Sequence, residues 1–196
     1  MVSGGADSDN LRGSENDDTI HGMGGGDLIF GYHRHDMLYG DDGNDIIQVE
    51  GQHFQSVDGG AGYDVLMLAV SAEAIDLHQL AGGITNIEEI DISGSGASSI
   101  AFPIQNVLNV TDARNALIIT GGRDDAVTFK ASDWTATGTT ETPPLVIPGV
   151  STPARSTCSA ATVEKSSSEL NVWVSANVLI RRASRAGSSL ARDPAG

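Results

Sequence analysis

The chain repeats one pattern of polar and aliphatic positions every nine residues between Gly4 and Met67. Five units follow in register, GGADSDNLR, GSENDDTIH, GMGGGDLIF, GYHRHDMLY and GDDGNDIIQ, and a sixth, GGAGYDVLM, begins at Gly59. The first six positions of a unit are rich in Gly, Asp and Asn, which favour tight turns. The last three place one aliphatic residue between two others, as in a short strand with alternating faces. The pattern therefore predicts short strands separated by turns.

Three columns of the repeat never change. The first position is always glycine: Gly4, Gly13, Gly22, Gly31, Gly40 and Gly59. The sixth is always aspartate: Asp9, Asp18, Asp27, Asp36, Asp45 and Asp64. The eighth is always Leu or Ile: Leu11, Ile20, Ile29, Leu38, Ile47 and Leu66. Because a three-residue strand cannot bury its aliphatic side chain alone, the units must stack on one another.

This nonapeptide resembles the G-G-x-G-x-D-x-U-x calcium-binding repeat of RTX proteins. The resemblance implies an all-β fold, a parallel β-roll or calcium-binding nonapeptide solenoid, in which two repeats make one coil. Odd repeats then stack on one side and even repeats on the other. The implied metal ligands are the side chains of Asp9, Asp18, Asp27, Asp36, Asp45 and Asp64, with the backbone carbonyls of Gly5, Gly25, Gly43, Gly60 and Gly62.

Electrostatics explains why such a stack needs a cation. Stacked strands lie about 4.8 Å apart, and like charges at about 5 Å repel by roughly 0.8 kcal/mol in water and about 3 kcal/mol at an effective dielectric of 20. A hard cation that accepts carboxylate and carbonyl oxygens removes this repulsion, and Ca²⁺ suits flexible oxygen cages better than Mg²⁺. We therefore expect several Ca²⁺ ions, held between the first and third, second and fourth, and third and fifth repeats.

Two irregularities qualify the pattern. In the fourth repeat Tyr32 and Arg34 replace small residues, and Arg34 adds positive charge, so the site between Asp18 and Asp36 is the weakest one. The interlude at 49–58 breaks the period by one residue. If it is a degenerate unit with a bulge, the sixth repeat stacks on the fifth, and its aspartate extends the ladder beyond Asp45.

Residues 68–138 are expected to form a β-rich cap at the end of the 1–67 roll. Short apolar runs separated by Gly and polar clusters predict strands; they are VLMLAV, IEEIDIS, SSIAF, NVLNVT, NALIIT and DAVTF. Ala72 to Leu80 fits one helical turn or a loop. This block resembles the region that follows the repeats in RTX exoproteins, and stacked repeats need such a cap.

The acidic pairs in the cap are more simply explained as solvated residues than as catalytic or metal-binding groups. Glu88 and Glu89 are adjacent in a strand, so they point to opposite faces, and we expect a solvated edge rather than a catalytic pair. Asp124 and Asp125 lie one residue out of register with the repeat, and a solvated turn is favoured over an extra calcium site.

The segment 139–196 has a different composition. A Pro-rich linker at Thr140–Pro153 precedes a Ser-rich tail, expected to be disordered, with one apolar run at Leu170–Ile180. RTX proteins usually leave bacteria through a type I secretion machinery that reads an uncleaved C-terminal signal. The position fits such a signal, whereas the four arginines after Ile180 and the lone Cys158 do not. A divergent secretion signal and aberrant coding sequence both remain open.

The charge and composition of the chain limit the kinds of partner that it can bind. The net charge is −15, which argues against nucleic acid, because phosphate binding needs clustered Lys and Arg. A single cysteine excludes an internal disulfide, so calcium is the expected staple. The sequence contains no run of 18 apolar residues, so it predicts no membrane-spanning helix. The first ten residues lack the features of a Sec signal peptide. We expect a secreted, extracellular bacterial protein, either a very short RTX protein or the C-terminal piece of a longer one.

Catalytic motifs are missing from the sequence. It contains no H-E-x-x-H, no G-x-S-x-G and no Walker A run, and His33 and His35 fit exposed turn residues better than a transition-metal site. The sequence thus predicts a calcium-binding module, not an enzyme, that folds on extracellular calcium and supports export and stability of an exoprotein. Two alternatives stay open: the C-terminal module of an RTX protease, lipase or epimerase, and an adhesin or surface-layer module.

Overall fold

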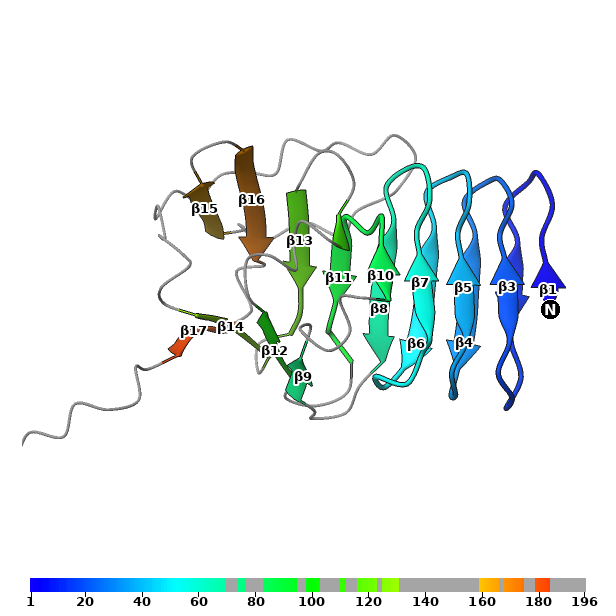
Figure 1. The fold of residues 1–196 in the computed structure, drawn as a ribbon, viewed down its shortest axis with the longest axis horizontal. Helices are drawn as coiled ribbons and strands as arrows, with labels where there is room; N and C mark the ends of the chain where they lie inside the picture. The colour runs from blue at the N-terminus through cyan, green and yellow to red at the C-terminus, as the bar shows by residue number, and fades with distance from the viewer. Residues whose placement is uncertain are drawn as a thin grey trace, which may run out of the picture.

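A computed structural model describes residues 1–69, 74–76, 83–94, 98–102, 110–111, 116–122, 125–130, 159–165, 168–174 and 179–183. Apart from Val110, whose backbone is helical, every residue assigned to an element in these ranges lies in a β-strand, and all strand pairs but one are parallel. The strands stack in open sheets along the long axis of the molecule, beginning at β1 (Figure 1). The chain is therefore an all-β protein built mainly from parallel strands.

Successive strands of the repeats alternate between two sheets. One sheet has the order β1 (Val2–Ser3), β3 (Thr19–His21), β5 (Met37–Tyr39), β7 (Ser56–Asp58), β10 (Ile84–Thr85). The other begins with β2 (Asn10–Arg12), β4 (Leu28–Tyr32), β6 (Ile46–Glu50), β8 (Val65–Ala69) and β11 (Glu89–Asp91). Odd and even repeats thus stack separately, as predicted, because each strand is followed by a turn that carries the chain to the opposite sheet.

The register follows the aliphatic column of the repeat. In the second sheet Leu11 pairs with Ile29, Ile29 with Ile47, and Ile47 with Leu66. The last pairing confirms that the sixth repeat stacks on the fifth. The interlude supplies β7, and the N–H groups of Gln55 and Ser56 both donate to the Asp36 carbonyl at 2.9 and 3.1 Å. Two donors to one carbonyl mark an irregularity at the start of β7, and from Met37 and Ser56 onward β7 pairs regularly with β5.

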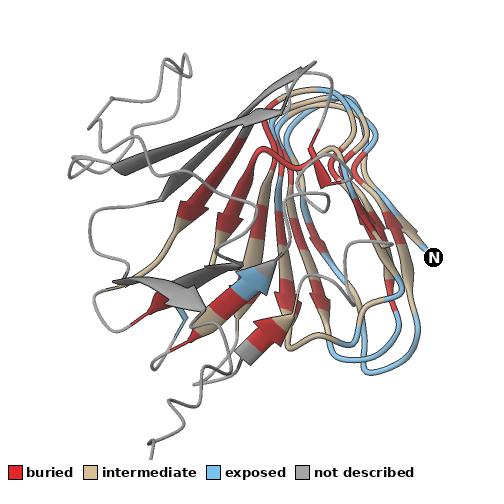
Figure 2. Ribbon diagram, turned by 60° about the vertical axis from the view of Figure 1, so that its left-hand side comes forward, coloured by how far each residue is buried: buried red, intermediate tan, exposed pale blue. Residues whose placement is uncertain are grey.

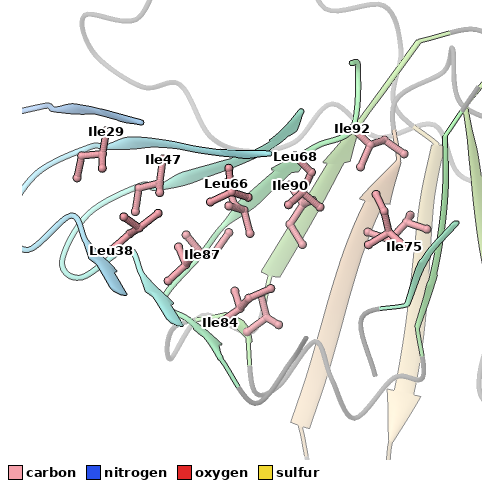
Figure 3. Close-up of a cluster of buried hydrophobic side chains, with 14 of the residues drawn as sticks. Ile29, Leu38, Ile47, Leu66, Leu68, Ile75, Ile84, Ile87, Ile90 and Ile92 are labelled. Atoms are coloured by element: carbon pink, nitrogen blue, oxygen red, sulfur yellow. The ribbon is translucent and has the colours of Figure 1, made fainter. Parts of the chain in front are cut away.

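The core lies between the two sheets. Side chains from the eighth position are fully buried at Ile20, Ile29, Leu38, Ile47 and Leu66. The cluster continues without a break through Leu68, Ile75, Ile84, Ile87, Ile90 and Ile92 (Figure 3). In Figure 2 the buried positions follow the strands, whereas exposed residues gather mainly in the turns near the N-terminus. The repeats and the block that follows them therefore share one hydrophobic core.

The block after the repeats extends the stack. Besides β11, the expected strands are found as β12 (Ser99–Phe102), β13 (Ala116–Thr120) and β14 (Ala126–Lys130), and most of the run at 106–111 lies outside the described residues. Part of the segment expected as a helical turn or loop is instead β9 (Ala74–Asp76), which pairs with β12 and buries Ile75. The burial of this isoleucine in the core outweighs the weak preference of the local sequence for a helical turn or a loop.

The tail differs from the expected disorder. It contributes β15 (Ser159–Lys165), β16 (Ser168–Val174) and β17 (Leu179–Ala183). β16 pairs in parallel with β13, β15 pairs antiparallel with β16, and β17 joins β14. The run Leu170–Ile180 is rich in β-branched residues, which favour strands. The Pro-rich linker lies outside the described residues.

Within the parts of the chain that the structure describes, no helix has the length and apolar character needed to cross a membrane.

Candidate cation site along the aspartate ladder

The sixth-position aspartates form two hydrogen-bonded rows. The odd ladder consists of Asp9, Asp27, Asp45 and Asp64. The N–H of each member donates to Oδ1 of the next, at 2.7 Å to Asp27, 2.7 Å to Asp45 and 2.9 Å to Asp64. The even ladder consists of Asp18 and Asp36, joined in the same way at 2.9 Å. The turns thus bring carboxylates from distant repeats into register along one edge of each sheet.

The second oxygen of three odd-ladder carboxylates has no partner. Oδ2 of Asp27, Asp45 and Asp64 is buried without a hydrogen bond, and these residues are at most 2% exposed. Native proteins rarely leave a buried polar atom unsatisfied, and the exceptions call for an explanation such as an ion. The three orphaned oxygens occur at equivalent positions of successive coils, so the explanation must repeat with the coil.

A backbone carbonyl lies beside each orphaned oxygen. A Cβ atom added to Gly22 would collide with both Asp27 Oδ2 and the carbonyl oxygen of Gly40. At Gly40 the same collision would involve Asp45 Oδ2 and the carbonyl oxygen of Gly59. At Gly22 and Gly40 the missing Cβ therefore leaves room in which a carboxylate oxygen and a carbonyl oxygen from the next coil both approach, whereas at Gly31 an added Cβ would meet Leu38 and Asp36 side chains instead.

Burial raises the pKa values of these carboxyl groups. It raises the pKa of Asp27 above the ordinary 3.8, that of Asp45 to about 6 and that of Asp64 to about 7. The N–H donated by the preceding aspartate opposes the rise in pKa, whereas the neighbouring carboxylates add to it. In the absence of positive charge, the carboxyl groups of the odd ladder therefore become progressively harder to ionise from Asp27 to Asp64.

The even ladder is shorter and better satisfied. Asp18 Oδ2 accepts from the N–H and Oγ of Ser14 at 2.6 and 2.8 Å, which lowers the pKa of Asp18. Burial raises the pKa of Asp36. Tyr32 and Arg34 adopt left-handed φ angles of 65° and 93°, where side chains are strained. Among the described residues, the buried carboxylate oxygens without a hydrogen-bond partner lie on the odd ladder and not on the even one.

The glycines predicted to supply carbonyls occupy different surroundings. The Gly5 carbonyl accepts from the N–H of Gly24 at 3.0 Å. The Gly25 and Gly43 carbonyl oxygens press against the fourth-position glycine of the next coil, so that a Cβ on Gly43 or Gly62 would collide with them. A Cβ on Gly60 would collide with the Asp41 carbonyl oxygen. Sequence reasoning missed the first-position carbonyls, which lie beside the orphaned carboxylates.

Glu88 and Glu89 are not at a solvated edge. Their exposed fractions are 4% and 8%, because β11 lies between β8 and β13. Glu88 Oε2 accepts from the N–H of Asp64 at 2.9 Å. Glu89 accepts from the Tyr63 hydroxyl at 2.7 Å and from Thr120 Oγ1 at 3.0 Å. The signal that could have found Glu88 is its place immediately before a strand, where the repeats carry aspartate.

Asp125 likewise departs from the expected solvated turn. It is 2% exposed, its Oδ1 accepts from Ser98 N–H at 2.8 Å, and its Oδ2 accepts from Gly122 N–H at 2.6 Å. Asp124 lies outside the described residues. Asp125 thus makes a ladder-type hydrogen bond, but both of its oxygens are satisfied by backbone donors.

The two turn histidines engage different acids. His33 Nε2 lies 3.0 Å from Glu50 Oε2, and His35 Nδ1 lies 3.9 Å from Asp17 Oδ1. Among the described residues no group of three or more His, Cys, Asp or Glu side chains gathers as a metal centre. A cation bound along the odd ladder must therefore draw ligands from backbone carbonyls as well as carboxylates.

Comparison of the chain with protein-family models, curated proteins and solved structures finds no match.

Proposed function

We propose that this chain is a calcium-binding module of the RTX β-roll type, in which the odd ladder holds several Ca²⁺ ions. The observation that carries the proposal is the row of buried, unpartnered oxygens on Asp27, Asp45 and Asp64. The Gly40 carbonyl near Asp27 Oδ2 and the Gly59 carbonyl near Asp45 Oδ2 supply the neutral ligands. Each ion is assigned to the space between successive coils.

The donor set fits a hard cation. Carboxylate and carbonyl oxygens are the ligands of Ca²⁺ and Mg²⁺, whereas transition metals favour imidazole and thiolate. The backbone turn fixes the positions of its carbonyls, so they cannot readily form the near-ideal octahedron that Mg²⁺ requires. Ca²⁺ accepts irregular coordination and therefore fits such a turn better. Calcium is therefore the ion that these residues suit best.

The energies indicate that binding and folding are coupled. One pKa step corresponds to about 1.4 kcal/mol. Ionising Asp45 and Asp64 in the calcium-free fold, with pKa values of about 6 and about 7 instead of 3.8, thus costs about 7 kcal/mol together at alkaline pH. This is comparable to the whole stability of a typical domain, about 5–15 kcal/mol. Each ion at 100-fold excess over its intrinsic Kd for the folded chain contributes about 2.7 kcal/mol, so three ions at that excess offset the penalty. The apparent Kd measured in a titration is weaker than the intrinsic one, because part of the binding free energy is used to ionise the ladder and fold the chain.

The proposed biological role follows from this coupling. In a cytosol poor in calcium the chain stays unfolded and exportable, and in millimolar extracellular calcium it becomes rigid. We propose that it acts outside the cell as a non-catalytic module that supports the export and stability of an exoprotein. The net charge of −15 and the single cysteine fit this role, since calcium takes the place of disulfides.

Isothermal titration calorimetry of the purified chain tests the proposal. We expect more than one Ca²⁺ ion per chain, with Kd of about 10⁻⁴–10⁻³ M as in extracellular modules, and little heat with Mg²⁺ at the same concentrations. The Asp42→Asn variant, which alters an exposed acid in the same turn, serves as the control and keeps full binding. A chain that takes up no calcium, or takes up magnesium equally well, overturns the proposal.

A further inference from the structure

The odd ladder does not end with the last nonapeptide. Asp64 N–H donates to Glu88 Oε2 at 2.9 Å, as Asp45 N–H donates to Asp64 Oδ1 at 2.9 Å. In the parallel pairing of β11 with β8, Glu89 stands opposite Val65. Glu88 therefore occupies the place of the sixth-position aspartate in a coil that carries no nonapeptide.

The coil that contains Glu88 also supplies a carbonyl at the matching place. Because Thr85 of β10 stands opposite Asp58, Asn86 stands opposite Gly59, a first-position glycine. A Cβ added to Gly59 would collide with the Asn86 carbonyl oxygen and would lie 2.7 Å from Asp64 Oδ2. The arrangement at Gly22 and Gly40 is thus reproduced once more, with asparagine in place of the next glycine.

The turn that connects these residues is shorter than in the repeats. Three residues, Asn86, Ile87 and Glu88, stand where a nonapeptide has six. Asn86 adopts a left-handed φ of 53°, which asparagine tolerates better than most residues, and Ile87 is fully buried in the core. Glutamate has one more methylene than aspartate, so its carboxylate reaches back to Asp64 across the shortened turn.

Among the described residues, the place that follows Glu88 in the next coil carries no carboxylate. Ile118 of β13 stands opposite Glu89, so the place equivalent to Glu88 is taken by Leu117, which is fully buried in the core. Glu88 is therefore the terminal carboxylate of the odd ladder, where the polar row gives way to apolar packing.

We propose that Glu88, Asp64 and the carbonyl of Asn86 hold a further divalent cation at the end of the odd ladder. This inference rests on the proposed function and adds a site outside the nonapeptide repeats. Two features point to a ligand there. The buried Asp64 Oδ2 has no hydrogen-bond partner. The Glu88 carboxylate accepts from the N–H of the same aspartate, and the Asn86 carbonyl and Asp64 Oδ2 both border the space beside Gly59. The site has fewer turn carbonyls than the preceding ones, so carboxylates make up more of its ligands.

The test is a comparison of Glu88→Gln with Glu89→Gln. Glutamine keeps an oxygen that accepts from Asp64 N–H but removes the charge, so the ladder hydrogen bond survives. Glu89 is the matched control because it is adjacent, similarly buried, and bonded through its carboxylate to Tyr63 and Thr120. Calcium stoichiometry is measured by calorimetry, together with the dependence of the folding equilibrium constant on calcium concentration.

We expect Glu88→Gln to bind one Ca²⁺ fewer than the unaltered chain and to reduce the linkage slope by about one, whereas Glu89→Gln retains both values. Equal stoichiometry and slope in the two variants overturns the terminal site but leaves the proposed function intact. Absence of calcium uptake by the unaltered chain overturns both. If Glu88→Gln does not fold at saturating calcium, Glu88→Asp, which keeps the charge but shortens the reach, must still lose the ion, and full stoichiometry in that variant contradicts the inference.

Discussion

Asp45→Asn separates the electrostatic role of the odd ladder from a purely structural one. Asp45 is fully buried, its Oδ1 accepts from Asp27 N–H at 2.7 Å, and its Oδ2 has no partner. Asparagine keeps the acceptor at Oδ1 and places an NH₂ group beside the carbonyl oxygen of Gly59. The substitution therefore removes a charge while preserving shape and the ladder hydrogen bond.

The expected effect has opposite signs with and without calcium. Burial raises the pKa of Asp45 from 3.8 to about 6, so at about pH 8 the ionised carboxylate destabilises the calcium-free fold by about 3 kcal/mol. Asp45→Asn removes this penalty, and in chelator the variant should be more stable than the parent by about that amount. The stabilisation gained on adding calcium should shrink by about 3–5 kcal/mol, because one or two ions at 100-fold excess over Kd are lost.

Urea denaturation followed by far-UV circular dichroism, in chelator and in calcium, measures both quantities. If the calcium-free parent is unfolded, the variant instead shows a gain of β signal in chelator. Asp42→Asn is the control and should shift the unfolding free energy by about 0.5 kcal/mol or less. A variant that is less stable than the parent in chelator, or an unchanged stabilisation by calcium, would refute the electrostatic reasoning.

The remaining predictions concern pH, the glycine column and the core. In chelator the unfolding free energy should fall as pH rises from about 4 to about 7. The folded chain raises the pKa of Asp45 to about 6 and that of Asp64 to about 7, so it favours their neutral carboxyl groups and loses stability as they ionise. A calcium-free fold that grows more stable over this pH range would contradict the prediction. Gly43→Ala should destabilise the calcium-bound fold by at least about 1–3 kcal/mol in urea melts, because its Cβ would collide with the Gly25 carbonyl oxygen at a φ of 150°. Gly51→Ala, where the nearest atom is His53 Cδ2 at 3.5 Å, should lose only the roughly 1 kcal/mol of a left-handed residue, and equal losses would argue against the close-packed column. Ile47→Ala should destabilise by about 2–5 kcal/mol, whereas Ile46→Ala, at a residue 38% exposed, should lose about 1 kcal/mol or less; thermal melts that reverse this order would refute the assigned faces of β6.

The sequence predicts those features that its period specifies. A strict column of Leu and Ile every nine residues requires stacking, and it identified Ile29 and Ile47 as neighbours in the core. The sixth-position column in the same way identified the ladder from Asp9 to Asp45. In both cases the repetition itself carries the three-dimensional information, because equal spacing in the chain becomes equal position in successive coils.

Features outside the period could not be read in this way. Glu88 follows a turn of three residues instead of six, so no spacing argument aligns it with Asp64. β9 and the strands of the tail depend on pairing partners far away in the chain, which local composition does not specify. The first-position carbonyls were missed because a sequence does not show which backbone oxygens face a side chain.

The most direct test of calcium-dependent folding is a titration of the purified chain with calcium, followed together by far-UV circular dichroism and size-exclusion volume, with magnesium as the control. The account predicts a gain of β signal and compaction at about 10⁻⁴–10⁻³ M calcium, and neither change with magnesium. A chain that is already compact and β-rich in chelator at about pH 8, and that does not respond to calcium, would contradict it, since the buried charges of the odd ladder would then need no cation.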